Sequence, residues 1–302
     1  MRNAAILLVR LRGTATEAAK NIVLAGVGRL VVWDPADVAA EDLGAGFFFG
    51  EDDVGKKRVD AAKARIESLN PLVAVETHHD PALEETAFES LIKDVDLVCV
   101  TDWDREGLIR INAVCRRFNK PFYAGGTYGL LGYIFCDLLQ HDYISPDRSA
   151  SKEAAKNVKL TASYCPLEVA LDHRWTDLKR RQTKELNPAA VFSILALWEF
   201  QTRHKGVLPE DSNYAAELEQ IATALLTKAE VNRQALPVMP RELIESLSVT
   251  APHELSPVCA VVGGMLAQDI LKALAARESP IANFFTFDGS TGGGTVCRLG
   301  MS

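Results

Sequence analysis

The residues that most suggest chemistry form a turn near the start of the chain, Val9-Arg10-Leu11-Arg12-Gly13-Thr14-Ala15. The turn lies between a continuous apolar run and a helical pattern, and Asp34 closes the next apolar run. A strand, a turn, a helix and a later acid form the layout of a dinucleotide site, in which amides at the helix N-terminus hold phosphates and the acid binds a ribose hydroxyl. Nucleotide binding is therefore the first function to test.

The glycines that such a turn requires are missing. In a G-x-G-x-x-G register they fall at positions that hold Arg10, Arg12 and Ala15, and only the intervening Gly13 is a glycine. An arginine there puts a long side chain where the pyrophosphate would lie, and its Cβ restricts positive φ. Two arginines can bind phosphate through their side chains, but backbone amides cannot cradle a phosphate that a Cβ excludes. The turn favours a nucleotide-binding scaffold that has lost its nucleotide.

Three other clusters carry weaker functional signals. Gly125-Gly126-Thr127 with Gly129 lies where ligands bind in open α/β sheets, but we favour a turn into the next strand. Gly292-Gly293-Gly294 is expected to be a loop between two strands. His78-His79-Asp80 is interpreted as a solvated turn, because adjacent histidines on a strand diverge and no third metal ligand is evident.

Two apolar features raise the question of a partner. Phe47-Phe48-Phe49 is equally consistent with a partner interface and with a loop folded back onto the sheet. Gly263-Gly264 lies inside an apolar helical pattern, where glycine costs about 1 kcal/mol relative to alanine. Close helix packing within the chain is the ordinary explanation for such a pair, and contact with a partner subunit is the more specific alternative.

The first 140 residues alternate between apolar runs and helical patterns, which indicates a parallel sheet with right-handed crossovers. A capping-box spacing between Thr14 and Glu17 predicts the start of the first helix. The expected strands are 4–9, 29–33, 72–76, 96–101 and 121–124, and the expected helices are 16–24, 55–69 and one through Arg110 and Cys115.

The rest of the chain divides at changes of pattern. Residues 133–143 are expected to form a longer strand or a hairpin, and 145–159 a loop. Helical patterns dominate 188–247, and a helix at 258–274 and a strand at 283–288 return to the α/β style. We therefore predict a Rossmann-like α/β fold with a mostly parallel sheet, divided into a Rossmann-like half (1–144), a loop and mainly helical insert (145–250) and a return to the first fold (251–302).

Longer stretches of the sequence resemble a known superfamily, the adenylating enzymes of the ThiF type that activate ubiquitin-like proteins and sulfur carriers. The resemblance is closest to the small, non-catalytic subunits of heterodimeric SUMO-activating enzymes, and it covers nearly the whole chain. The matching stretches are Ala18 to Val27, Leu69-Asn70-Pro71, Tyr164 to Leu167, Pro257 to Gly264 with Ala267-Gln268-Asp269, Asn283-Phe284-Phe285 and Phe287-Asp288-Gly289.

The resemblance implies where active members hold ATP and magnesium. The position of an ATP-binding arginine is Ala45 here, within Asp42-Leu43-Gly44-Ala45-Gly46, and that of a lysine is Arg58, which keeps the charge but not the compact ammonium. Asp102, followed by Trp103, partly matches a magnesium ligand, and Asp34 is retained. We interpret Asp34 and Asp102 as remnants, assign no catalytic residue, and expect neither cofactor nor metal on this chain.

The resemblance also implies a partner. A large catalytic subunit would bind ATP and magnesium, adenylate the C-terminal glycine of SUMO and form its thioester, while this chain acts as its regulatory subunit. Cys165 is a tempting nucleophile, but nothing ties His173 or another base to it, so we expect a structural cysteine. The family carries a helical segment before the first strand with an arginine that reaches the partner's ATP site; Arg2 is not assigned that role.

Three alternatives stay open. A self-sufficient homodimeric enzyme of the ThiF or MoeB type would need a usable phosphate loop, which Arg10 and Arg12 oppose. An NAD-binding oxidoreductase would explain Asp34 but has neither the glycines nor a candidate proton donor. The regulatory subunit of a Nedd-type activating enzyme is a closer alternative, although such subunits are much longer than 302 residues.

Composition narrows the setting. Hydrophobic residues make up 48% and charged residues 24%, which excludes a chain that is disordered throughout. The net charge of −7 disfavours nucleic-acid binding. Six cysteines without zinc spacing indicate a reducing compartment, and with the resemblance we expect the nucleus and possibly the cytoplasm. No apolar run of about 18 residues is evident, so we expect no transmembrane helix.

Overall fold

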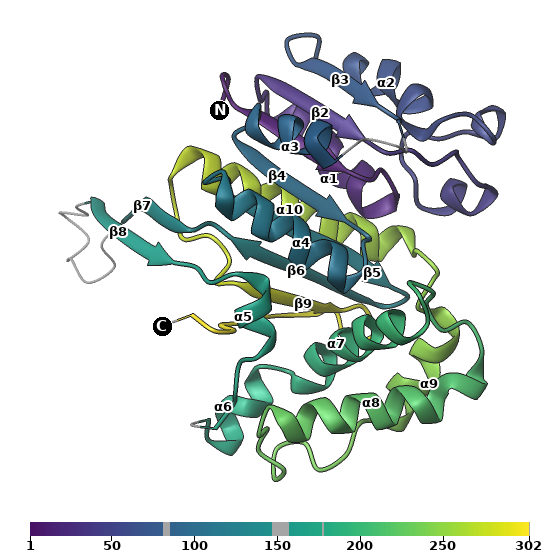
Figure 1. Ribbon diagram of the computed structural model, residues 1–302, viewed down its shortest axis with the longest axis vertical. Helices are drawn as coiled ribbons and strands as arrows, with labels where there is room; N and C mark the ends of the chain where they lie inside the picture. Colours follow the sequence, from purple (N-terminus) through teal and green to yellow (C-terminus); the bar gives the residue numbers. More distant parts are fainter. Residues whose placement is uncertain (81–84, 147–156, 177, 302) are drawn as a thin grey trace.

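An eight-stranded mixed sheet forms the centre of the computed structural model, which describes residues 1–80, 85–146, 157–176 and 178–301 (Figure 1). The strands follow one another across the sheet in the order β10-β9-β6-β5-β4-β1-β2-β3. Their bounds are β1 Ala5–Val9, β2 Arg29–Trp33, β3 Ala74–His78, β4 Leu97–Thr101, β5 Phe122–Tyr128, β6 Leu131–Asp137, β9 Phe284–Asp288 and β10 Gly293–Cys297.

The first five strands are parallel, as the alternating pattern predicts, and the last three are antiparallel. From β1 the chain moves outward to β2 and β3, and then returns to β4 on the other side of β1. In open α/β sheets, ligands bind at the carboxyl ends of the strands where the order reverses in this way. The turn at residues 10–13 therefore lies at the expected switch point, and the predicted Rossmann-like fold is confirmed.

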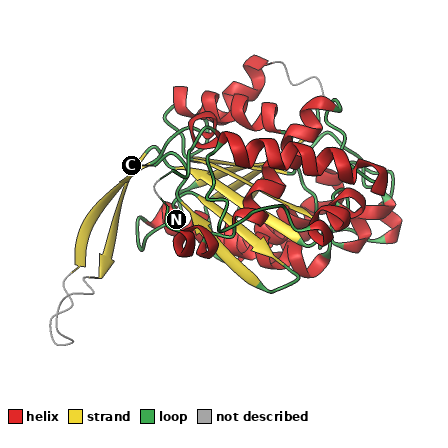
Figure 2. Ribbon diagram, turned by 90° about the horizontal axis from the view of Figure 1, so that it is seen from below, coloured by secondary structure: helices red, strands yellow, loops and turns green. Residues whose placement is uncertain are grey.

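Helices cover both faces of the sheet (Figure 2). One face carries α1 (Gly13–Leu24), α2 (Arg58–Leu69) and α10 (Ser256–Ala275), which share a buried cluster with Ile6, Leu30 and Tyr123. The other face carries α3 (Glu85–Lys93), α4 (Arg105–Arg117) and α7 (Pro188–Arg203), packed on a second cluster.

The remaining helices extend from that second face. They are α5 (Leu167–Leu171), α6 (Arg180–Glu185), α8 (Ala215–Lys228) and α9 (Arg241–Thr250). Trp198 of α7 joins this helical region to the sheet: it is fully buried, and its Nε1 donates to the Tyr128 hydroxyl at 2.8 Å. The mainly helical character of 188–247 is therefore confirmed, whereas the division into 1–144, 145–250 and 251–302 stays a prediction.

A two-stranded ribbon stands away from the body of the molecule (Figure 2). It pairs β7 (Gln140–Pro146) with β8 (Asn157–Ser163) in antiparallel register. The strand character predicted for 133–143 is confirmed, but the segment is neither one long strand nor a hairpin, because β6 stays in the main sheet and β7 leaves it to pair with β8. The loop predicted at 145–159 is wrong at both ends, because residues 145–146 belong to β7 and residues 157–159 belong to β8. Residues 147–156 of that loop lie outside the described residues.

Close packing of α10 on α1 explains one glycine of the pair. A Cβ at Gly263 would lie 2.6 Å from the Thr14 carbonyl oxygen and 2.7 Å from the Glu17 Cβ, whereas a Cβ at Gly264 would meet nothing within 4 Å. By length and composition alone, α10 also qualifies as a membrane span, which the sequence expectation missed. Its inner side packs on α1 and the sheet as a core helix does.

Several predicted boundaries are wrong for identifiable reasons. The first helix begins at Gly13 rather than at a box formed by Thr14 and Glu17, and Glu17 pairs instead with Lys20. The segment Gly125 to Thr127 is not a turn: β5 continues through it because the antiparallel strand β6 pairs along its whole length. The turn into β6 lies two residues after Thr127, at Gly129 with φ +56°.

Candidate functional site

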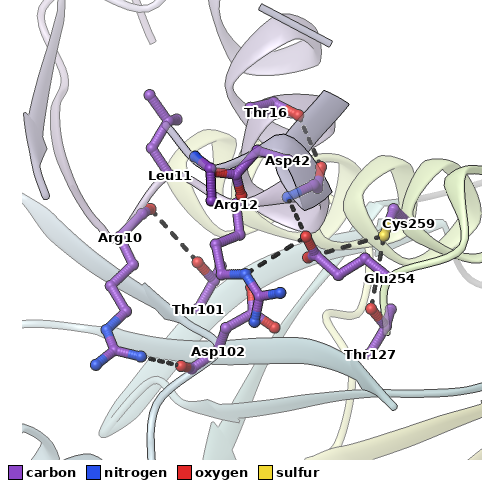
Figure 3. A network of polar contacts seen from close by, with 12 residues as sticks. Arg10, Leu11, Arg12, Thr16, Asp42, Thr101, Asp102, Thr127, Glu254 and Cys259 are labelled. Atoms are coloured by element: carbon purple, nitrogen blue, oxygen red, sulfur yellow. Dashed lines mark hydrogen bonds and ion pairs between the residues drawn. The ribbon is translucent and has the colours of Figure 1, made fainter. Parts of the chain in front are cut away.

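Arg10 follows the last residue of β1 and keeps a backbone conformation that suits glycine. Its φ is +67°, a region that costs a residue with a Cβ about 1–2 kcal/mol. The Cβ of Arg10 therefore makes this conformation costly but does not prevent it. The side chain points away from the loop, and its Nη1 donates to the Asp102 carbonyl at 2.5 Å (Figure 3). Its guanidinium lies 4.5 Å from the Trp103 ring centroid.

Arg12 precedes α1 and pairs with an acid from the far end of the chain. Its Nε lies 3.5 Å from the Glu254 carboxylate, which also accepts a hydrogen bond from the Gly13 amide at 3.1 Å (Figure 3). Burial alone lowers the pKa of Arg12, but Glu254, Asp102 and Asp42 outweigh it, so the net pKa is raised. The first amide of α1, where a phosphate would bind in a working loop, is therefore occupied by a carboxylate.

Small residues pack tightly behind that amide. A Cβ at Gly13 would lie 2.8 Å from the Ala45 Cβ, 3.0 Å from the Cys259 sulfur and 3.2 Å from the Glu254 Cδ. Ala15, at the last position of the G-x-G-x-x-G register, is fully buried where α1 packs on the core. The space beside the loop is therefore filled by this chain's own atoms.

Asp34, at the ribose position, is fully engaged inside the chain. One carboxylate oxygen accepts from the Leu11 amide at 2.8 Å, and the other accepts from the Ala36 amide at 2.9 Å. Arg58 adds an Nη1 contact to Asp34 at 3.3 Å and forms a forked ion pair with Asp42 at 2.8 and 3.1 Å. Arg58, which matches the family lysine, therefore neutralises two buried acids of the loop region.

Asp102 lies at the end of β4, opposite Arg10. Its Oδ2 is buried and has no hydrogen-bond partner among the described residues. Burial, followed by the nearby Glu254 charge, raises the pKa of Asp102 to about 7. The described residues contain no group of three or more His, Cys, Asp and Glu side chains that could hold a metal ion.

Aromatic rings cover the same edge of the sheet. Trp33 at the end of β2 stacks on Trp103 after β4 with ring centroids 5.8 Å apart, and Phe88 of α3 meets Trp33 edge-on at 5.7 Å. Arg10 lies on the Trp103 ring. Together with Glu254 at the helix N-terminus and Arg58 on Asp34, this arrangement does not fit a triphosphate held by the loop backbone.

Cys165 lies away from this edge. Its thiol donates to the Leu299 carbonyl at 3.2 Å and accepts from the Asn283 side-chain amide at 3.7 Å. Burial, followed by the Asp137 charge, raises the pKa of the thiol, which opposes the thiolate that a nucleophile needs. All six cysteines of the chain are free thiols.

The other candidate clusters have ordinary contacts. His79 pairs with Asp60 at 3.7 Å, and His78 ends β3. Phe48 is buried while Phe47 is 51% exposed beneath the Lys20 ammonium, so the aromatic triplet is split between the core and the surface. Gly292 precedes β10 and Gly293 opens it, so the predicted loop is shorter than expected.

Sequence reasoning missed Glu254 and the two tryptophans. Trp33 ends β2 and Trp103 lies two residues after the end of β4. Both strands flank β1, so the meeting of the two rings at one edge could have been inferred from the parallel order. Glu254 lies 241 positions after Gly13, and no spacing signal links the two.

Comparisons with known proteins agree with this architecture. The ThiF family model matches residues 1–301. The chain is 33% identical to SUMO-activating enzyme subunit 1 of Xenopus laevis and to that of Homo sapiens, in each case over 99% of this chain and 90% of the relative. It is 34% identical to the Danio rerio protein of the same name, over 98% of this chain and 88% of the relative. The chain therefore belongs to the ThiF family, together with these SUMO-activating enzyme subunits.

Proposed function

We propose that this chain is the regulatory, non-catalytic subunit of a SUMO-activating enzyme. Relatives that match it nearly end to end bear the name SUMO-activating enzyme subunit 1. The observation that carries the non-catalytic part is the hydrogen bond between the Gly13 amide and the Glu254 carboxylate, because it uses the amide that a phosphate would need. A subunit with this loop depends on another polypeptide for ATP.

The proposed partner is a larger catalytic subunit of related fold. It binds ATP and magnesium, adenylates SUMO and carries the thioester, and this chain completes a pseudo-twofold pair of adenylation folds around that centre. The free thiols of the chain are compatible with a reducing compartment, and we propose the nucleus and possibly the cytoplasm.

Co-purification followed by a thioester assay tests this proposal. The full chain is co-expressed with the catalytic subunit, and the complex is incubated with ATP, magnesium and SUMO. We expect a stable one-to-one complex and a reductant-sensitive SUMO adduct on the partner only. A chain that forms no complex, or that carries the adduct itself, contradicts the proposal.

A self-sufficient adenylating enzyme is the second candidate, favoured only by the retained acids Asp34 and Asp102. It predicts pyrophosphate release by the chain alone with a ubiquitin-like substrate. Exchange of labelled pyrophosphate into ATP separates the two candidates, since a regulatory subunit gives none without its partner.

A further inference from the structure

The segment that carries Glu254 is held in place by backbone contacts. It connects α9 to α10 and runs beside the turn between β5 and β6, where the Gly129 amide donates to the His253 carbonyl at 3.1 Å. Gly129 and Glu254 also form an isolated parallel bridge. The main chain therefore fixes where the Glu254 side chain starts, before any side-chain contact is made.

The Glu254 carboxylate is buried beside Arg12 and the Gly13 amide, with the acid Asp102 also nearby. Its side chain is 5% exposed, so the charge needs partners within the chain. Its positive partners are the Gly13 amide at 3.1 Å, at the positive end of the twelve-residue helix α1, and the Arg12 guanidinium at 3.5 Å. The Cys259 thiol adds a long contact to the other carboxylate oxygen at 4.0 Å. The first two are the kinds of group that bind a phosphate, a helix N-terminal amide and an arginine.

We propose that Glu254 is the resident anion of the loop at residues 10–13, and that it positions this loop by joining the start of α1 to the end of the helical region. The carboxylate stands where an oxyanion from solution would otherwise bind. It also excludes that oxyanion, because the carboxylate packs directly against the start of α1: a Cβ built at Gly13 would lie 3.2 Å from the Glu254 Cδ. This inference does not depend on the proposed partner subunit.

The test uses the full chain and inorganic phosphate as the probe. Thermal unfolding is measured in chloride and in phosphate at equal ionic strength, for wild type, Glu254→Ala and Glu254→Gln. Glu242→Ala is the matched control, because it removes the same charge from an exposed position on α9. Arg12→Gln combined with Glu254→Ala tests whether phosphate binds at this loop.

We expect Glu254→Ala to lower the Tm in chloride, and we expect phosphate to restore part of the lost Tm. About 20 mM phosphate should raise the Tm of Glu254→Ala by about 2 °C more than that of the wild type, which corresponds to a phosphate dissociation constant of about 1 mM. Wild type, Glu254→Gln and the control should not respond, since the loop is filled or unchanged. The double variant should lose the response, because the arginine that binds the phosphate is gone.

Two results overturn the proposal. One is an equal phosphate response in wild type and Glu254→Ala, which means that the carboxylate does not occupy the anion position. The other is a response that survives loss of Arg12. If Glu254→Ala does not fold, Glu254→Gln decides: a Tm below that of Glu242→Gln supports a bound charge, and an equal Tm contradicts it.

Discussion

The backbone amide of Gly13 donates a hydrogen bond to the Glu254 carboxylate at 3.1 Å, across 241 positions of the chain. This contact lies at the point where the α/β architecture would present a phosphate to the first turn of α1. The same edge of the sheet is covered by the stacked rings of Trp33 and Trp103. Side chains of this chain therefore occupy the edge of the sheet where a nucleotide would bind in this architecture.

Arg58 should be a structural residue of this loop rather than a nucleotide ligand. Its side chain is 12% exposed and pairs with Asp34 and Asp42, both nearly fully buried. Arg58→Ala leaves two buried acids without their cation, so we expect the free energy of unfolding to fall by about 3–5 kcal/mol. Urea denaturation measures the loss.

Lys63→Ala on the same helix is the control for Arg58, and it should change stability by less than about 0.5 kcal/mol. An Arg58→Ala variant as stable as that control would show that the forked pair contributes nothing.

The two adjacent glycines of α10 should respond oppositely to alanine. Gly263→Ala pushes a methyl group against the Thr14 carbonyl and the Glu17 Cβ, so we expect a loss of about 1–3 kcal/mol. Gly264→Ala adds a methyl group in open space within a helix, so it should stabilise the free chain by up to about 1 kcal/mol. Equal effects of the two variants on the urea midpoint would contradict the close approach of α10 to α1.

Cys165→Ser should leave SUMO thioester formation by the complex intact. The thiol is partly buried and hydrogen-bonded to the Leu299 carbonyl, and burial raises its pKa. A hydroxyl can make the same hydrogen bond, so the fold should be retained. Non-reducing electrophoresis of the complex after incubation with ATP and SUMO is the measurement; a lost adduct with the complex still assembled would make Cys165 a participant in the reaction.

Asp102 should make stability depend on pH. Burial and the Glu254 charge raise its pKa from 3.8 to about 7, against the opposing Arg12 and Arg10 charges. The folded chain therefore keeps a proton that the unfolded chain loses, and the contribution of Asp102 to stability falls as pH rises from about 4 to about 7. Asp102→Asn cannot ionise and should lack this slope.

The measurement for Asp102 is urea unfolding of both proteins on either side of that window. Asp102→Asn should gain stability relative to wild type as pH rises, and the difference should be constant above about pH 8. A difference that does not change with pH would mean that Asp102 ionises as an exposed acid does.

The parallel half of the sheet could be predicted because its strands are continuous apolar runs, as in Ile6 to Val9, which are buried on both faces. The extent of β5 could not, because Gly125 and Gly126 carry no side-chain signal and the strand is extended by pairing with β6. The first helix begins at Gly13 rather than at a local capping motif because Glu254, a distant residue, accepts from its first amide.

Part of the candidate site could also be predicted, because some of its residues follow a local sequence pattern. Arg10 and Arg12 follow β1 and Asp34 follows β2, so a motif register that spans both strands identifies them. The contacts that occupy those residues come from tertiary packing: Arg58 reaches Asp34 from the start of α2, and Glu254 arrives from the connection before α10. Neither pairing has a sequence period from which it could have been inferred.

We predict that the loop at residues 10–13 does not bind ATP. Equilibrium titration of the isolated full chain with a fluorescent ATP analogue and magnesium tests this most directly. We expect no saturable binding in the micromolar range, and the appearance of such binding once the catalytic subunit is added. Saturable micromolar binding by the chain alone, competed by unlabelled ATP, would contradict a nucleotide site filled by Glu254, Arg10 and Arg12.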